Sequence, residues 1–191
     1  MTEQVPLTTS PLPYKLTVED FFRLDDAGAF EGYGKTELIR GEVYYMNAQH
    51  RPHARAKAAL YDAIRDWIGA HNTELALLSE ATVAMAPNSA PEPDLILTTE
   101  PDGEGPVPIH SVRLLVEIAD TTQKNDLRVK AELYAEHGVP EYWVVDLKAQ
   151  RVHRMWLPGA EGYTRNDEAE FGGRLVAATI DGLSIELPPL R

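Results

Sequence analysis

The segment VRLLVEIA, residues 112–119, constrains the fold most, because it is almost continuously apolar. A strand with one solvated face alternates apolar and polar residues, whereas a strand covered on both faces does not. We therefore predict a strand buried on both faces. Residues 124–137 predict a helix that ends at Gly138, a preferred left-handed cap, with Pro140 beyond it. A further strand is expected at EYWVVD, residues 141–146.

Helical spacing is clearest upstream of these strands. Ala56, Leu60 and Ile64 recur at four-residue intervals, which predicts an amphipathic helix over residues 52–70, with Pro52 in its first turn. The segments between the two helices predict one strand or a bent pair at 75–86, a strand at 94–99, a surface loop at 101–108 and the strand at 112–119. The expected order between residues 52 and 146 is therefore helix, strand, strand, strand, helix, strand.

The N-terminal part predicts a short helix and a hairpin. Residues 16–24 indicate a helix that Thr17 is placed to cap, with Asp20 three residues later, where a capping box has Glu or Gln. Residues 36–46 are typical of two short strands that pivot on Arg40-Gly41.

The C-terminal part predicts more strands. Residues 151–157 are expected to form a hairpin with the strand before them, and the tail adds edge strands. The predicted fold class is α/β, with a mixed sheet flanked by helices. No linker or internal repeat divides the chain, so we predict a flexible arm at residues 1–15 and a single domain over 16–191.

The composition excludes several classes of protein. No apolar run of the 191 residues approaches the roughly 20 needed to span a bilayer. The first residues lack both the basic start and the apolar stretch of a signal peptide. The absence of cysteine excludes disulfides and zinc–thiolate sites. We expect a cytoplasmic protein without a membrane partner.

The net charge of −12 argues against a nucleic-acid partner, because Lys and Arg that neutralise phosphates provide much of the affinity in such complexes. An acidic total still permits a local basic cleft. Metal ions can also offset charge where carboxylates gather.

Asp94 and Glu117 are the two carboxylates in the most unusual positions. Asp94 follows Pro93 at the start of an apolar strand, and Glu117 lies inside one. A buried carboxylate is costly unless it is paired, hydrogen-bonded or bound to metal. On neighbouring strands, the two could hold Mg²⁺, which takes one or two carboxylates plus water or phosphate oxygens. The alternatives are a turn residue for Asp94, and for Glu117 a buried ion pair with Arg113 or Lys130.

Lys130 is the third candidate catalytic residue. It lies between Leu127 and Tyr134 in the apolar stripe of its predicted helix, whereas lysines usually occupy the solvated face. A lysine there could reach a buried carboxylate or stabilise charge on a phosphate undergoing cleavage. The alternative is a lysine that extends past the helix edge and pairs with Asp126.

Three further residues could support such a site. His53 falls on the core-facing stripe of the first long helix, where it could bind a phosphate, hold a carboxylate or be an ordinary core histidine. Glu42, in the predicted hairpin, is the candidate for an acid that binds the metal or supports its ligands, and Glu37 is another possible supporting residue. His50 and Arg51 flank the helix start, where an anion is also favoured.

These motifs together resemble a family of restriction endonucleases known as Uma, within the PD-(D/E)XK nuclease superfamily. The resemblance runs over almost the whole chain, and it is most specific from Glu117 to Asp146. The matching positions are Pro93-Asp94, Val116-Glu117-Ile118, Asp126, Lys130, Gly138 to Asp146, LTVEDFFRL, ELIRGEVYYM and His53. The superfamily core has the same order of helices and strands that periodicity predicts here. The resemblance implies a restriction-endonuclease-like fold.

One position departs from the superfamily pattern. The motif places a lysine two residues after the glutamate, and here that residue is Ala119. The resemblance implies that Lys130 supplies the missing amine, with Lys124 as a second candidate, and that Asp126 supports the site.

The function expected from the sequence is a metal-dependent endonuclease that acts on DNA. Its catalytic residues would be Asp94, Glu117 and Lys130, and its cofactor Mg²⁺, with Mn²⁺ as a substitute. We expect a homodimer, because cutting both strands needs two sites. The alternative is a non-catalytic interaction protein, or one that binds a phosphorylated ligand, on a nuclease scaffold.

Overall fold

The computed structural model describes residues 12–46, 48–71, 73–119 and 126–187. Most of the predicted arm, residues 1–11, lies outside this part of the chain. The helical segments are α1 (Val18–Asp26), α2 (Arg51–His71), the 3-10 turn η1 (Ile109–Ser111), the π-helical η2 (Asp126–Lys130) and α4 (Ala131–Glu136). The strands are β1 (Thr36–Ile39), β2 (Glu42–Tyr45), β3 (Ala76–Ser79), β4 (Val83–Ala84), β5 (Leu95–Thr98), β6 (Val107–Pro108), β7 (Val112–Ala119), β8 (Glu141–Asp146), β9 (Arg151–Gly159), β10 (Gly162–Glu170), β11 (Arg174–Val176) and β12 (Ser184–Glu186).

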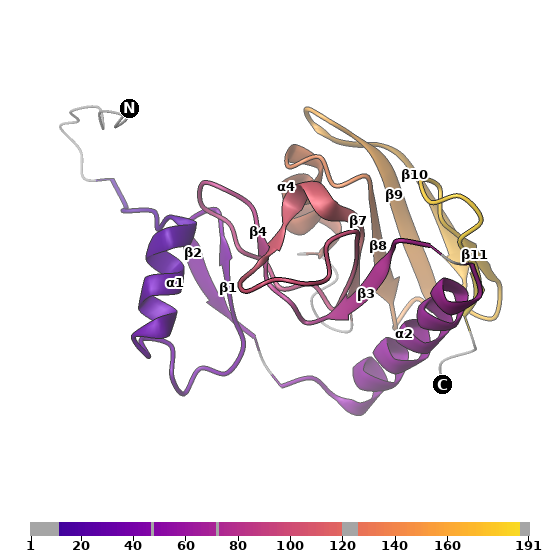
Figure 1. The fold of residues 1–191 in the computed structure, drawn as a ribbon, viewed down its shortest axis with the longest axis horizontal. Helices are drawn as coiled ribbons and strands as arrows, with labels where there is room; N and C mark the ends of the chain where they lie inside the picture. Colours follow the sequence, from indigo (N-terminus) through magenta and orange to yellow (C-terminus); the bar gives the residue numbers. More distant parts are fainter. Residues whose placement is uncertain (1–11, 47, 72, 120–125, 188–191) are drawn as a thin grey trace.

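A six-stranded mixed sheet forms the centre of the fold (Figure 1). Its strands lie in the order β10-β9-β8-β7-β5-β3. Only β7 and β8 pair in parallel within it, with Glu117 opposite Val144, and the other neighbours are antiparallel. The predicted order of helix, three strands, helix and strand is confirmed by α2, β3, β5, β7, α4 and β8.

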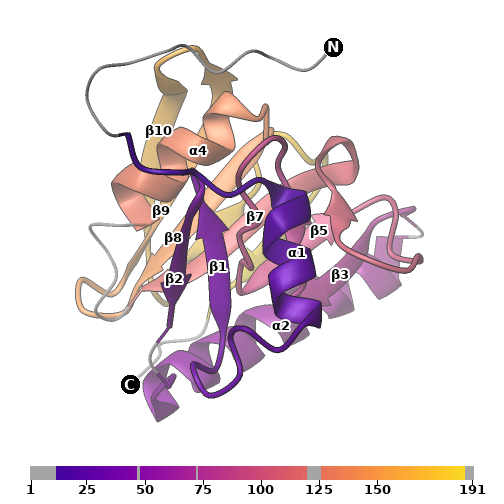
Figure 2. The ribbon, with the colours of Figure 1, turned by 90° about the vertical axis from the view of Figure 1, so that its left-hand side faces the viewer.

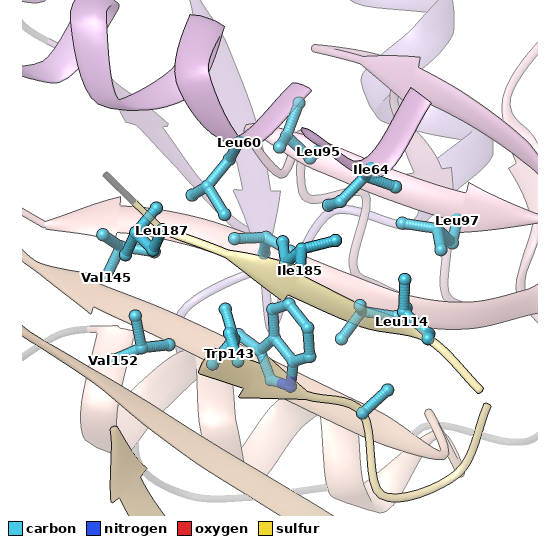
Figure 3. Close-up of a cluster of buried hydrophobic side chains, with 14 of the residues drawn as sticks. Leu60, Ile64, Leu95, Leu97, Leu114, Trp143, Val145, Val152, Ile185 and Leu187 are labelled. Atoms are coloured by element: carbon cyan, nitrogen blue, oxygen red, sulfur yellow. The ribbon is translucent and has the colours of Figure 1, made fainter. Parts of the chain in front are cut away.

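One face of the sheet is covered by α2 and the β11–β12 hairpin (Figure 3). Leu60 and Ile64 of α2 are fully buried against Leu114 and Trp143, with Ile185 of β12 in the same cluster. Burying each aliphatic side chain of this size stabilises the fold by about 1.5–3 kcal/mol. The apolar stripe that predicted α2 is therefore its contact surface.

The other face of β7 packs against η2 and α4. The alternation along β7 divides its residues, so that Leu114 and Val116 face α2 while Leu115 joins the opposite cluster with Tyr134 and Tyr142. Because both faces are covered, β7 can be almost continuously apolar. Glu117 lies two residues after Leu115 and therefore on the same face of β7, which is the face toward α4.

The β1–β2 hairpin and α1 form a third unit beside the sheet (Figure 2). Arg40 and Gly41 both have positive φ, 50° and 79°, as a two-residue hairpin turn requires. Thr17 and Asp20 form the predicted capping box of α1. Leu38 packs on Phe21 of α1 and also bridges to Ala90, which joins the hairpin to the loop before Asp94.

Three local expectations need correction or refinement. The predicted loop 101–108 ends in β6, because Val107 is buried and pairs with β4. The segment 75–86 forms two strands in different sheets, β3 and β4. The predicted helix 124–137 begins, within the described residues, with a π-helical turn before the regular turns of α4.

The C-terminus of α4 follows its prediction. Gly138 has φ +73°, its N–H donates to the carbonyl of Ala135, and the N–H of Val139 donates to the carbonyl of Tyr134. This pair of bonds is a Schellman cap. It fixes the end of the helix that carries Lys130 and Tyr134.

Glu141 anchors the C-terminal hairpin from inside the fold. This fully buried carboxylate accepts hydrogen bonds from Trp143 Nε1, the Ala178 N–H, and the N–H and hydroxyl of Thr179. It thereby ties the turn between β11 and β12 to the start of β8.

Glu141→Gln should therefore lower the free energy of unfolding by about 2 kcal/mol, because the amide turns a donor toward N–H groups that need an acceptor. Urea denaturation measures this loss. The matched control Glu186→Gln, at an exposed position of β12, should change stability by less than about 0.5 kcal/mol. Equal effects of the two changes would contradict the anchoring role.

No helix in the described part of the chain combines the length and apolar character that crossing a membrane requires.

Candidate active site

A buried ion-paired cluster lies between the central sheet, η2 and the hairpin. Lys130 Nζ is 2.8 Å from Glu117 Oε1 and 3.1 Å from Glu37 Oε2. Lys130 and Glu37 are each 1% exposed, and Glu117 is 6% exposed. Three separate elements, η2, β1 and β7, thus bring one ammonium and two carboxylates together away from bulk water.

Tyr134, one turn after Lys130, completes the contacts of Glu117. Its hydroxyl donates to Glu117 Oε1 at 2.9 Å, the same oxygen that Lys130 approaches. Burial, together with the negative charge of Glu117, raises the pKa of Tyr134 well above its ordinary value. The hydroxyl therefore remains a donor throughout the neutral range.

Asp94 is held by the neighbouring strand and by α2. Its Oδ2 accepts from the Ile118 N–H at 2.8 Å and lies 3.1 Å from His53 Nε2. Its Oδ1 lies 3.3 Å from Gln49 Nε2 and 3.7 Å from Lys57 Nζ. Burial alone would raise the pKa of Asp94, but the contacts with His53 and the Ile118 N–H outweigh it and lower that pKa. The carboxylate is therefore ionised at neutral pH.

Main-chain hydrogen bonds connect Asp94 with the ion-paired cluster of Glu37, Glu117 and Lys130. Ile118, which donates to Asp94, directly follows Glu117 along β7. The Glu92 N–H, two residues before Asp94, donates to Glu37 Oε1 at 2.9 Å. Asp94, directly before β5, and Glu117, within β7, are thus held on neighbouring strands of the sheet.

The donor types fit a hard divalent cation. Asp94 and Glu117 offer carboxylate oxygens, which suit Mg²⁺. Among the residues that the structure describes, no three His, Asp or Glu side chains form a preformed metal-binding group. Mg²⁺ does not require one, because waters and substrate phosphates complete its six ligands. Glu117 would share its carboxylate between Lys130 and the ion.

Comparison with known proteins identifies the family. Residues 18–188 match the family model Uma2, described as "Putative restriction endonuclease". The chain belongs to the Uma2 family. No curated protein matches it. Among solved structures it is similar to the crystal structure of a putative nuclease belonging to DUF820 from Anabaena variabilis ATCC 29413, with 16% identity and a TM-score of 0.68, over 90% of this chain and 94% of that one.

These matches confirm the resemblance and the fold class predicted from the sequence. The Uma2 chain has the restriction-endonuclease-like mixed sheet with helices on its faces. The N-terminal hairpin and the C-terminal strands are additions at either end of the predicted core order.

Two alternatives from the sequence are now decided. Lys130 does not extend past the helix edge, because it is buried and paired. Glu117 does have the buried ion pair with Lys130 that its position allowed. Asp126 begins η2, but its side chain lies outside the described part of the structure, as does all of Lys124.

The hairpin contributes a different acid from the one that the sequence favoured. Glu42 is exposed and pairs with Lys15 and the Tyr44 hydroxyl, whereas Glu37 enters the buried cluster. No local pattern distinguished Glu37. It is buried because both faces of β1 are covered, one by α1 and the other by the cluster around Lys130. The sequence placed Tyr134 only in the apolar stripe of its helix, because the spacing of apolar residues does not predict a hydrogen bond from its hydroxyl.

A pocket of about 390 Å³ opens beside the site. Its lining includes Lys35, Glu80 and Glu92, together with aromatic residues of α1. Asp94, Glu117 and Lys130 are not among the lining residues. The pocket therefore adjoins the buried cluster without containing it.

Proposed function

We propose that this Uma2 protein is a divalent-metal-dependent endonuclease that hydrolyses phosphodiester bonds in DNA. The observation that carries the proposal is the convergence of Asp94, Glu117 and Lys130, with Glu37, at one position of a restriction-endonuclease-like sheet. Two carboxylates and an amine are the groups that metal-assisted phosphodiester hydrolysis uses.

Each side chain has a distinct role in this proposal. Asp94 and Glu117 would hold Mg²⁺, or Mn²⁺ in its place, and a bound ion would supply polarisation of the phosphoryl oxygen and a lower pKa for water. Lys130 stabilises the negative charge that develops on the phosphate as water attacks in line. His53 orients Asp94, and Glu37 keeps Lys130 in place. Residues 16–191 would act as one domain, and two copies would cut the two strands.

The direct test is incubation of the purified protein with supercoiled, linear and branched DNA. We expect nicking or cleavage with Mg²⁺ or Mn²⁺ and none with EDTA. Absence of cleavage of every DNA form in the presence of Mn²⁺ would overturn the assignment.

Metal binding gives a second, independent test. Wild-type protein should bind Mn²⁺ at millimolar concentration or below in a calorimetric titration. Asp94→Asn should weaken this binding by about 10- to 100-fold, because the neutral amide is a poor ligand for a hard ion. An exposed acid provides the control, and Glu132→Asn should leave the affinity unchanged.

One observation favours a competing function: Lys130 already pairs with both Glu37 and Glu117 inside the protein. A buried cluster whose carboxylates both contact its own lysine can be structural, as in a non-catalytic interaction protein on the same scaffold. No Mn²⁺ binding by the wild type, with no change on Asp94→Asn, would support that reading instead.

A further inference from the structure

The start of α2 departs from the charge of the rest of the chain. Residues 43–61 contain no Asp or Glu, although the protein has 30 of them and a net charge of −12. The same stretch carries Arg51, Arg55 and Lys57, together with His50 and His53. The first two turns of α2 are therefore a local basic surface on an acidic protein.

Part of this basic surface is open to solvent. Arg51 and Arg55 are exposed, and their spacing of four residues places them on one face of the helix. Among the described residues, Arg51 has no ion-pair partner. The arginines of β9 differ from Arg51 in having ion-pair partners. Arg151 pairs with Glu168 and Arg154 pairs with Asp167, both on β10. The Arg51 charge is therefore available to a binding partner, whereas the Arg151 and Arg154 charges on β9 are neutralised within the protein.

The basic surface continues into the candidate active site. Lys57, two residues after Arg55, pairs with Glu80 at 2.7 Å and lies 3.7 Å from Asp94 Oδ1. His53 Nε2 lies 3.1 Å from Asp94 Oδ2. Both ribbon views place this end of α2 on the side of the β1–β2 hairpin, which carries Glu37 (Figures 1 and 2). A chain of phosphates that enters the site would therefore meet Arg51 and Arg55 next.

His53 adds an independent sign of an interaction at this end of the helix. Its ring is nine-tenths buried, and its Nδ1 has no hydrogen-bond partner in the described structure. Buried polar atoms in native proteins usually have a partner. Main-chain N–H groups at the start of α2 also favour anions, and a phosphate there could accept a hydrogen bond from Nδ1 when this nitrogen carries a proton.

We propose that the exposed face of the first two turns of α2 binds the phosphodiester backbone of DNA beside the scissile phosphate. The inference deepens the proposed nuclease function and rests on it for the identity of the polyanion. It also reconciles a net charge of −12 with a DNA substrate, because only the surface at the site must be basic.

Salt-dependent binding tests the proposal separately from cleavage. The Glu117→Gln protein, incubated with a fluorescent DNA duplex in EDTA, reports binding by anisotropy at several salt concentrations. Adding Arg51→Gln and Arg55→Gln should weaken binding by roughly 10-fold or more and reduce the slope of log K against log salt by about 2, one for each lost phosphate contact.

Arg65 provides the matched control on the same helix. It is exposed like Arg51, but it pairs with Asp62 and Asp66 and lies farther along α2. Arg65→Gln should leave both the affinity and the slope unchanged. Any of three outcomes would overturn the proposal. The salt slope of the double variant could equal that of the Glu117→Gln parent, or Arg65→Gln could weaken binding as much as the double variant. Poly-glutamate could also displace the labelled duplex as well as unlabelled DNA does. If the wild type cleaves DNA while the slope is unchanged, the surface assignment fails and the nuclease assignment stands.

Discussion

Lys130→Met is expected to lower the free energy of unfolding by about 3–5 kcal/mol, because it leaves two buried carboxylates without their cation. Glu37 and Glu117 both contact this ammonium, and neither is open to water. Cleavage should fall by at least about 100-fold, since the charge that forms on the phosphate loses its stabilising donor. Chemical denaturation and initial cleavage rates, at a temperature where the variant is folded, measure the two effects.

Glu117→Gln is the milder change, because it keeps the buried Lys130–Glu37 pair. It removes the charge of one candidate metal ligand, so it should abolish cleavage with a smaller loss of stability than Lys130→Met.

Two further variants separate the charge effect from general disruption. Lys148→Met removes an exposed lysine and should change neither quantity measurably. Adding Glu37→Gln to Lys130→Met removes one of the unpaired charges, so part of the lost stability should return. Full cleavage by a folded Lys130→Met protein would exclude a catalytic role for this lysine and leave only a structural one.

The sequence could reveal the main sheet and most of the site because burial leaves strong patterns. β7 is nearly all apolar, so its one carboxylate, Glu117, was conspicuous. Lys130 was conspicuous for the same reason on its helix. The start of α1 was predictable from local chemistry alone, since a capping box depends on residues three apart.

The missed features depend on contacts between distant segments. Glu37 reaches Lys130 across 93 positions of the sequence, and nothing local distinguishes it from Glu42 two residues beyond Arg40. The π-helical turn of η2 is a matter of backbone hydrogen bonding that side-chain spacing does not record. Such turns often occur at functional positions in helices, and this one ends at Lys130.

Tyr134→Phe is expected to weaken Mn²⁺ binding and to reduce the cleavage rate by about 10- to 100-fold, the usual effect of removing a group that orients a metal ligand. The reason is the 2.9 Å hydrogen bond from the Tyr134 hydroxyl to Glu117 Oε1, which fixes the carboxylate in one orientation. KM for DNA should stay close to that of the wild type, because the Tyr134 hydroxyl acts on Glu117 and not on the substrate. Calorimetric Mn²⁺ titration and steady-state kinetics separate these effects.

Tyr163 makes a matched control for this hydroxyl. Its OH is also buried, but it has no hydrogen-bond partner in the described structure, and burial raises its pKa as it does that of Tyr134. Tyr163→Phe should therefore leave Mn²⁺ affinity and kcat unchanged, and it should not reduce stability, because no hydrogen bond is lost. Equal losses of metal affinity in the two variants would show that the Tyr134 hydroxyl does not position Glu117. A loss of stability in Tyr134→Phe without any change in Mn²⁺ affinity would assign this hydrogen bond to the fold alone.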